Sequence, residues 1–124
     1  MATDRIVYCL TRDREMAAAL DERLVGAIAF FYNDAARLHQ AVTLRRPDVV
    51  LVDTGAVRAE YGDAGLGPVF DFLRQRAPTA RLAVRPGSPS VEHLVAAEAG
   101  SGVEVVPSDA EGCISAVAVA CRAA

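Results

Sequence analysis

The chain contains no lysine, since all 13 of its basic residues are arginine. This absence excludes a lysine-dependent phosphate-binding loop, a Schiff base and a titratable catalytic amine. Acidic residues outnumber the basic ones, which gives a formal charge of -3, and the arginines form no basic block. The electrostatic footprint of a nucleic-acid-binding domain is therefore missing, and we expect no nucleic-acid partner.

Long apolar runs are missing too. The longest one, Ala116 to Cys121, is far too short to cross a bilayer. The segment after Met1 has no apolar core of the signal-peptide type. We therefore expect a cytoplasmic protein that does not bind a membrane.

Cysteine is scarce, with three residues in the chain. An odd number of cysteines without a secretion signal does not indicate a disulfide framework. Cys9 falls inside an apolar strand pattern, where a small buried side chain is expected rather than a reactive thiol.

The 124 residues are 52% apolar and 23% charged, which fits one globular domain spanning 1–124. Short β-rich runs alternate with stretches of helical period, the pattern of a parallel α/β sheet. Strands are expected at Arg5 to Leu10, Ala27 to Tyr32, Val49 to Val52, Arg81 to Val84 and Val103 to Val106.

Five helices are expected between and after these strands. Predicted N-terminal caps are Asp13, Asn33 or Asp34, Ser90, and Ser108 with Glu111 as a capping box. The helix between the third and fourth strands should begin at Gly67 and Pro68. The stretch from Thr54 to Leu66 is expected to be a long Gly-rich loop. Because the third strand ends in Asp53, this carboxylate should lie at the functional edge of the sheet.

The order of these elements resembles the CheY-like receiver domain of two-component response regulators over nearly the whole chain. Residues 46–53, RPDVVLVD, are similar to the family's "RPDLVLLD" strand, so the resemblance makes Asp53 the phosphoacceptor equivalent. Ala99 and Gly100 are similar to the family's "AGA" turn, and residues 106–111 fall on its "KPFDPEE" junction. The resemblance implies a flavodoxin-like (βα)5 three-layer sandwich with five parallel strands in the order 2-1-3-4-5.

The chain departs from this family at the residues that carry its chemistry. Receivers place two acidic residues after the first strand to hold Mg²⁺, where this chain has Cys9, Leu10 and Thr11. The family's Thr or Ser after the fourth strand falls at Arg85 or Pro86, and its Lys falls at Val106. Phosphoryl transfer depends on positioning and charge neutralisation, so these changes remove the main source of catalysis. We expect a degenerate receiver without a cofactor, in which phosphorylation of Asp53 is impaired or absent.

Two side chains leave alternatives open at this site. Asp13 is a helix cap by its position, but with Asp53 it is also the remaining candidate for a metal ligand. Arg85 is either a solvated surface residue or a fork onto Asp53 that mimics a charge-compensated state.

Protein contacts are the function that this resemblance implies. The loop after Asp53 carries Arg58, Glu60 and Tyr61, which form either a recognition patch or a disordered segment. The family's partner or dimer face, on the fourth helix and fifth strand, would include His93, Glu98 and Glu104 here. The sequence identifies neither the partner, such as a kinase, regulator or output domain, nor the signal.

Two other classes of protein compete with this interpretation. Residues 63–67 and 81–90 resemble segments of STAS domains, the anti-sigma factor antagonists, with Ala64 at the place of the phosphorylated Ser. A parallel pair of strands at Arg5 to Leu10 and Ala27 to Tyr32, joined by a helix, would separate the receiver from the STAS alternative. An enzyme is disfavoured because His39 and His93, the only histidines, have no nucleophile at a matching spacing.

Overall fold

The computed structural model describes residues 4–124. Within them, five parallel strands form a sheet in the order β2-β1-β3-β4-β5, which confirms the predicted topology. The strands are β1 (Arg5–Leu10), β2 (Ala27–Tyr32), β3 (Val49–Asp53), β4 (Arg81–Arg85) and β5 (Val103–Val105).

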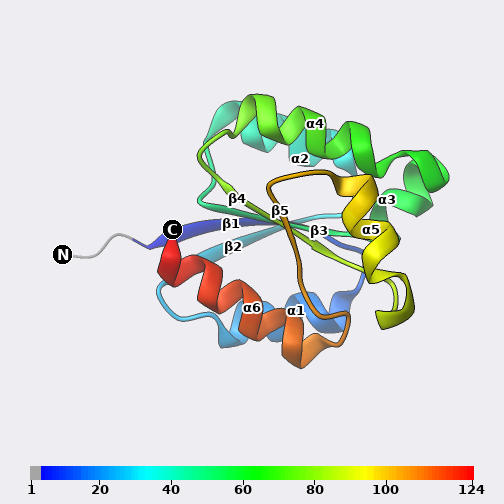
Figure 1. Cartoon of the computed structure of the whole chain (residues 1–124). Coiled ribbons are helices and arrows are strands. Elements are labelled where there is room, and N and C mark those ends of the chain that lie inside the picture. Colours follow the sequence, from blue (N-terminus) through cyan, green and yellow to red (C-terminus); the bar gives the residue numbers. More distant parts are fainter. Residues whose placement is uncertain (1–3) are drawn as a thin grey trace.

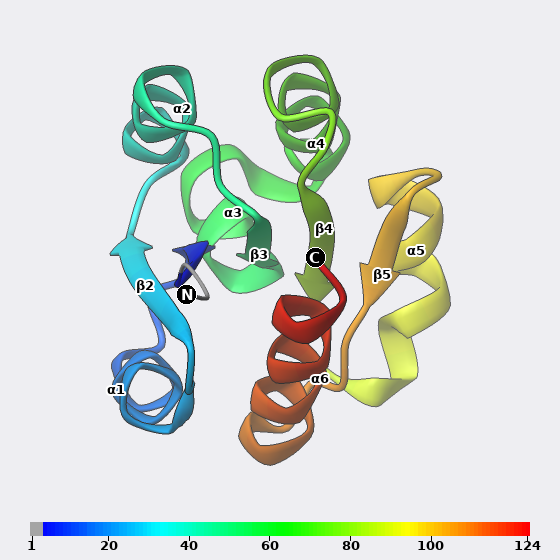
Figure 2. The same cartoon turned by 90° about the vertical axis from the view of Figure 1, so that its left-hand side faces the viewer.

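Helices cover both faces of this sheet (Figures 1 and 2). One face carries α1 and α6, and the opposite face carries α2 and α4, while α5 lies beside the edge strand β5. The helices are α1 (Arg14–Arg23), α2 (Ala35–Leu44), α3 (Thr54–Tyr61), α4 (Leu66–Arg76), α5 (Glu92–Ala99) and α6 (Ala110–Ala123). This is the expected three-layer arrangement, with six helices in residues 4–124 instead of the five predicted.

The side chains of the central strand β3 explain the two hydrophobic cores. All five residues of β3 are buried, because helices pack on both faces of the strand. Val50 and Val52 point into the core under α2 and α4, where Phe70 is the largest fully buried side chain. Val49 and Leu51 point the other way, into the core under α1 and α6.

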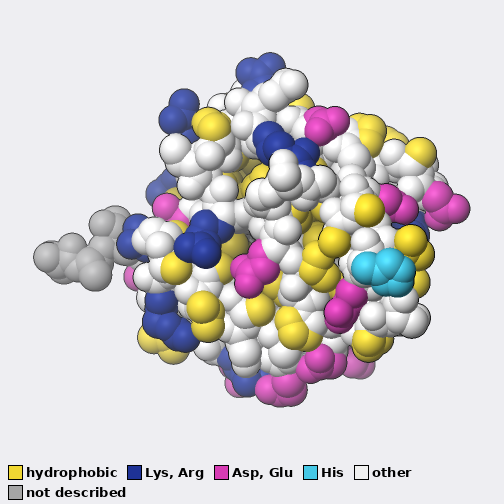
Figure 3. Space-filling view, viewed as in Figure 1, with side chains coloured by type: hydrophobic (Ala, Val, Ile, Leu, Met, Phe, Trp, Pro, Cys, Tyr) yellow, Lys and Arg dark blue, Asp and Glu magenta, His cyan; other side chains and the backbone are white. Residues whose placement is uncertain are grey.

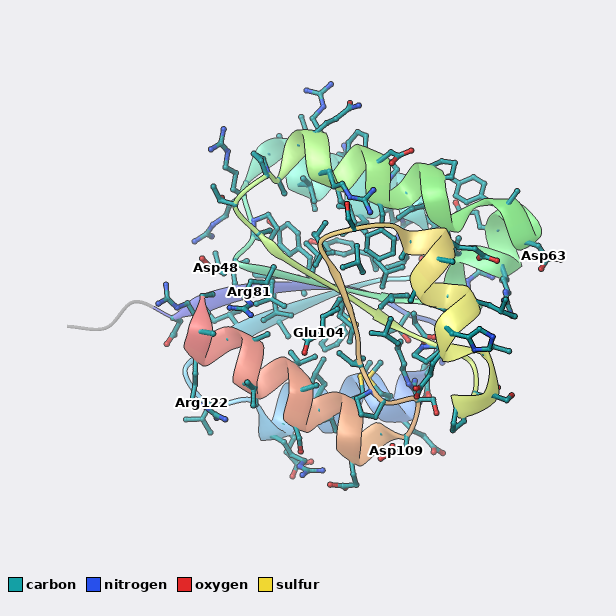
Figure 4. The ribbon with its side chains drawn as sticks, in the orientation of Figure 1. Asp48, Asp63, Arg81, Glu104, Asp109 and Arg122 are labelled. Carbon is teal, nitrogen blue, oxygen red and sulfur yellow. The ribbon has the colours of Figure 1, made fainter. Side chains whose placement is uncertain are left out.

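Aspartate side chains accept backbone N–H groups at the ends of several helices and strands. The side chains of Asp13 and Asp34 accept hydrogen bonds from the N–H groups of Met16 and Arg37, so the caps of α1 and α2 are confirmed, with Asp34 as the second one. Asp48 accepts the N–H of Ile6 at 2.8 Å, at the end of the sheet opposite to Asp53 (Figure 4).

The prediction of a loop from Thr54 to Leu66 is wrong. This stretch forms α3 and a short 3-10 turn, η1 (Gly62–Ala64). Three glycines, Gly55, Gly62 and Gly65, favoured a loop, but tertiary packing overrides this weak preference. The Asp53 side chain accepts the Gly55 N–H at the start of α3, and Ala56 and Val57 are buried. The Glu60 carboxylate also accepts the N–H of Ala35 at 2.7 Å, which ties α3 to the start of α2.

Two predicted caps are wrong as well. Ser90 lies inside a 3-10 turn, η2 (Pro89–Val91), and its hydroxyl bonds that of Ser88 rather than a helix N–H. At α6 the cap is Asp109, which accepts the Gly112 N–H at 2.7 Å. Glu111 makes no capping box, because Arg23 on α1 holds its carboxylate at 2.7 Å.

None of the helices described within residues 4–124 combines the length and the apolar character needed to span a membrane.

Candidate functional site at the carboxyl end of the sheet

Three adjacent strands bring the candidate residues together at one edge of the sheet. In the register of the sheet Leu10 pairs with Val52, and Asp53 pairs with Arg85. Thr11 follows β1 directly, so its side chain reaches the end of β3. The carboxyl end of a parallel sheet thus gathers residues that are far apart in the sequence, as expected.

The Asp53 carboxylate is enclosed by donors. Its Oδ2 accepts the Thr11 hydroxyl at 2.9 Å and the Arg85 Nη1 at 3.3 Å. Its Oδ1 accepts the Gly55 N–H at 3.3 Å. With its side chain only 12% exposed, the carboxylate is held by one hydroxyl, one amide and one guanidinium. This satisfies a buried charge, which would otherwise be costly.

The side chain of Arg85 connects the separate segments that form this site. Its Nη1 lies 3.0 Å from Asp13 Oδ2 as well as 3.3 Å from Asp53, and its Nε donates to the carbonyl of Ser108 at 2.8 Å. The Thr54 hydroxyl donates to the Arg85 carbonyl, which fixes the backbone of the same residue. Arg85 is therefore not a solvated side chain, and it contacts Asp53 through the single nitrogen Nη1 rather than through a two-nitrogen fork.

The electrostatics of the site follow from this bridge. Burial of the Arg85 guanidinium lowers its pKa, but the bond to Asp13 and the charge of Asp53 outweigh burial and raise it. The pKa of Asp13 is lowered, first by the Met16 N–H bonded to its carboxylate and next by Arg85. Asp13 therefore combines the helix cap with an ion pair.

The donor set does not fit the Mg²⁺ that receivers use. Asp13 has one oxygen on the Met16 N–H and the other on Arg85, and Asp53 faces the same guanidinium. Mg²⁺ requires several oxygen ligands in near-octahedral geometry, and a fixed cation between the two carboxylates opposes it. Across residues 4–124, no group of three or more His, Cys, Asp or Glu side chains is arranged to hold a metal ion.

The other positions where the chain departs from the receiver pattern supply no polar side chain. Leu10, Pro86 and Val106 are buried, so they surround the site with apolar groups. The thiols nearby are inert. Burial raises the pKa of Cys113 to about 11 and that of Cys9 well above its ordinary value.

The residues expected to form an interaction surface lie on two neighbouring regions. Arg58 and Tyr61 are on α3, where Arg58 is 3.8 Å from Asp63 and Tyr61 is 51% exposed. Arg58 and Glu98 of α5 line the same small cleft, so α3 and α5 meet there. His93 on α5 and Glu104 on β5 are both exposed. Figure 4 shows Glu104 beside α5. Apolar and acidic side chains intermingle over this face (Figure 3).

Sequence reasoning missed one contact of the site and one buried histidine atom outside it. The Ser108 carbonyl accepts the Arg85 Nε, and no side-chain pattern indicates a backbone acceptor. His39 stacks on Phe72 with ring centroids 3.9 Å apart, and its buried Nε2 has no hydrogen-bond partner among the described residues. The contact of Arg85 with Asp53 was one of the two alternatives that the sequence left open, because both residues end adjacent strands.

Comparisons with known proteins identify the fold. No protein-family profile and no curated protein sequence matches the chain. Among solved structures, the chain is similar to the signal receiver domain of an HD domain-containing protein from Pseudomonas fluorescens Pf-5. The two share 15% sequence identity at a TM-score of 0.72, over 99% of this chain and 90% of that one.

Two further structures agree. The receiver domain of the Francisella response regulator 1452 is 13% identical at a TM-score of 0.71, over 97% of this chain and 98% of that chain. A Burkholderia pseudomallei response regulator, solved with a phosphorylated aspartic acid, a calcium ion and citrate, is 16% identical at a TM-score of 0.64. That match covers 95% of this chain and 66% of the other.

The chain therefore has the fold of a response-regulator receiver domain. The STAS alternative gains no support from these structures. β1 and β2 are parallel and joined by α1, which is the arrangement expected of the receiver and not of the STAS domain.

Proposed function

We propose that this receiver fold is an atypical signalling module in which Arg85 neutralises Asp53 permanently, so that phosphorylation at Asp53 is impaired or absent. The module acts through protein–protein contacts and not as an enzyme. The observation that carries the proposal is the bridge from Arg85 to Asp53 and Asp13, at 3.3 and 3.0 Å.

The bridge opposes phosphorylation because of what the reaction requires. An aspartyl phosphate forms when a carboxylate oxygen attacks phosphorus while cations neutralise the charge of the phosphoryl group. Here the oxygen Oδ2 of Asp53 is engaged by Thr11 and Arg85, and Oδ1 by the Gly55 N–H. The guanidinium supplies positive charge, but its Nη1 is committed to Asp13 and Asp53 and its Nε to the Ser108 carbonyl. The attacking oxygen would have to exchange these partners before it could react.

The same bridge supports a fixed conformation. Arg85 ends β4, Asp13 begins α1, and the Ser108 carbonyl lies between β5 and α6. One charged side chain thus links segments that flank the carboxyl end of the sheet. In a receiver that switches, the charge at this end changes with phosphorylation. We infer that this chain keeps one charge-compensated state instead.

The partner surface that we propose is the face of α5 and β5 together with the adjoining end of α3. Leu94 is 54% exposed there, and Ala96 and Ala97 are exposed beside it. Glu98 and Glu104 border these apolar side chains, which fits a protein partner with an apolar contact and a basic rim. A kinase, a regulator, an output domain or a second copy of the chain could supply such a surface.

Amide NMR spectra with Mg²⁺, and then with beryllofluoride, test the impaired pocket. We expect no saturable shifts of the amides around Asp53 at millimolar Mg²⁺, and no further change with beryllofluoride, which mimics a phosphoryl group. Saturable shifts confined to Thr11, Asp53 and Arg85 would refute the proposal. The Arg85→Ala variant is the second arm. If it leaves both stability and partner binding unchanged, the bridge has no functional role.

A further inference from the structure

The edge strand β2 has an unpaired side. Within residues 4–124, β1 is the only strand that pairs with it, and Figure 2 shows β2 at the outside of the sheet. The carbonyls of Gly26 and Tyr32 accept the N–H groups of Arg5 and Thr11, at 3.0 and 2.9 Å. Since backbone groups alternate in direction along a strand, the N–H and C=O of Ala27, Ala29 and Phe31 point away from the sheet.

Nothing in the sequence of this strand protects that edge. Natural edge strands avoid association by lysine, proline, inward charges or bulges. β2 reads AIAFFY and contains no charged residue and no proline. Its register with β1 is continuous from Ala27 to Tyr32, so it has no bulge. The strand is therefore regular, apolar and open along its length.

Apolar side chains lie exposed beside the open edge. Ile28 is 48% exposed and Phe30 is 41% exposed. Phe30 contacts Tyr8 edge-on, with ring centroids 6.0 Å apart, so it projects on the face of the sheet that α2 covers. Leu44, near the end of α2, is also strongly exposed. Ile28 and Phe30 share one face of the strand, and apolar side chains exposed next to each other favour an interaction surface.

We propose that a second copy of this chain docks on β2, so that the two strands pair antiparallel about a two-fold axis through Ala29. In this register all three outward-pointing residues of each strand find partners: Ala29 lies opposite Ala29, and Ala27 lies opposite Phe31. These hydrogen-bonded pairs supply about six backbone hydrogen bonds. Ile28 of each copy then lies opposite Phe30 of the other, in the non-hydrogen-bonded pairs where side chains approach most closely.

The side chains of β2 are complementary to themselves in this register. On the face toward α1, the small Ala27 meets the large Phe31, so the two bulky rings do not collide. Beyond the strand, Val25, which is 93% exposed, comes opposite Asn33. Asn33 borders a groove of about 580 Å³ that Phe31, Tyr32 and Leu44 also line. Arg14, Arg37 and Gln40 line the same groove, so Val25 would meet a mixed apolar and polar surface in the second copy.

This pairing leaves the proposed partner face free. β2 and β5 are the two opposite edges of the sheet, and α5 lies beside β5 (Figure 2). A dimer through β2 would present two α5–β5 faces pointing in opposite directions. In the dimer, a second copy of the chain covers the edge of β2. The α5–β5 face then remains available to a different protein.

Sedimentation of the full chain from about 1 μM to about 1 mM tests the dimer, since weak strand pairing falls in this range. We expect a concentration-dependent dimer. Phe30→Lys adds a charge to the exposed strip and should raise the dissociation constant at least about tenfold. Ala29→Pro should do the same, because it removes only an outward N–H and proline is tolerated at such edge positions. Circular dichroism checks that both variants stay folded.

Leu94→Lys probes the α5–β5 face, and Val119→Lys, which places the same charge on an exposed apolar residue of α6 outside both surfaces, is the matched control. Both substitutions should leave the dissociation constant unchanged. A chain that is monomeric at every concentration would overturn the proposal. So would a dimer that Leu94→Lys disrupts and that Phe30→Lys and Ala29→Pro do not, because the interface would then be the α5–β5 face.

Cross-linking tests the register directly. Ile28→Cys and Phe30→Cys chains, mixed and oxidised, should form a disulfide between the two variants, since opposed Cα atoms in such a pair are about 4.5 Å apart. Each variant alone should cross-link less. The native Cys9, Cys113 and Cys121 are buried, so the parent chain serves as the background. A mixture that cross-links no better than the separate variants would overturn the register.

Discussion

Replacement of Arg85 by methionine should show how strongly the carboxyl end of the sheet depends on one cation. Methionine keeps much of the length of the side chain and removes the guanidinium. Asp53, with its side chain 12% exposed, would keep the Thr11 hydroxyl and the Gly55 N–H but lose its charged partner.

The magnitude follows from the burial of each contact. Removal of one member of a buried ion pair costs about 3–5 kcal/mol, because the other charge is stranded. Asp53 retains two neutral donors, which reduces this loss. The Asp13 side chain is 40% exposed, so its pair with Arg85 adds only about 0–1 kcal/mol. We therefore expect Arg85→Met to lower the free energy of unfolding by about 2–3 kcal/mol.

A double-mutant cycle with Asp53→Asn separates the stranded charge from lost packing. If the charge is the cause, the second substitution should recover part of the loss, with a coupling energy of about 1–2 kcal/mol. Urea unfolding at neutral pH, followed by circular dichroism, measures all four proteins. Arg81→Met, at the exposed start of the same strand, is the matched control and should change stability by less than about 0.5 kcal/mol. An Arg85→Met loss as small as this, or strictly additive effects, would refute the reasoning.

Three further results are expected. Thr11→Asp combined with Arg85→Thr and Val106→Lys should restore saturable Mg²⁺ binding in NMR titrations, because it replaces the bridging cation by a second carboxylate and a separate lysine. Burial lowers the pKa of His39 below its ordinary 6.5, so the unfolded chain binds the proton more readily and stability should fall as the pH drops below about 6.5. His39→Gln should flatten this decrease in pH-dependent thermal unfolding. Glu60→Ala should lower the free energy of unfolding by about 1 kcal/mol, because the Ala35 N–H loses its acceptor.

Each of these results has its own control. The single Thr11→Asp variant should stay without Mg²⁺ binding, since Arg85 remains in place. His93→Gln, on an exposed part of α5, should leave the pH dependence as it is. Glu60→Gln keeps an oxygen acceptor and should lose less stability than Glu60→Ala. A rebuilt pocket that ignores Mg²⁺, an unchanged pH slope for His39→Gln, or equal losses for the two Glu60 variants would contradict the respective explanation.

The alternation of strands and helices followed from the pattern of apolar residues along the chain. The continuous apolar run of β3 predicted a strand covered on both faces, and the resemblance to receivers supplied the strand order. The position of Asp53 at the end of that run placed it at the functional edge. The caps Asp13 and Asp34 were also predictable, because a cap depends on residues within one turn.

Only the tertiary structure decided which groups Asp53 and its neighbours touch. Arg85 meets Asp53 and Asp13 across separations of 32 and 72 residues, and such contacts depend on strand register rather than on local pattern. The same holds for α3, a Gly-containing stretch that becomes helical because Asp53 and Glu60 anchor its two ends. Local conformational preferences contribute only fractions of a kcal/mol per residue. Where such a preference conflicts with packing or with paired charges, the tertiary contacts therefore determine the conformation.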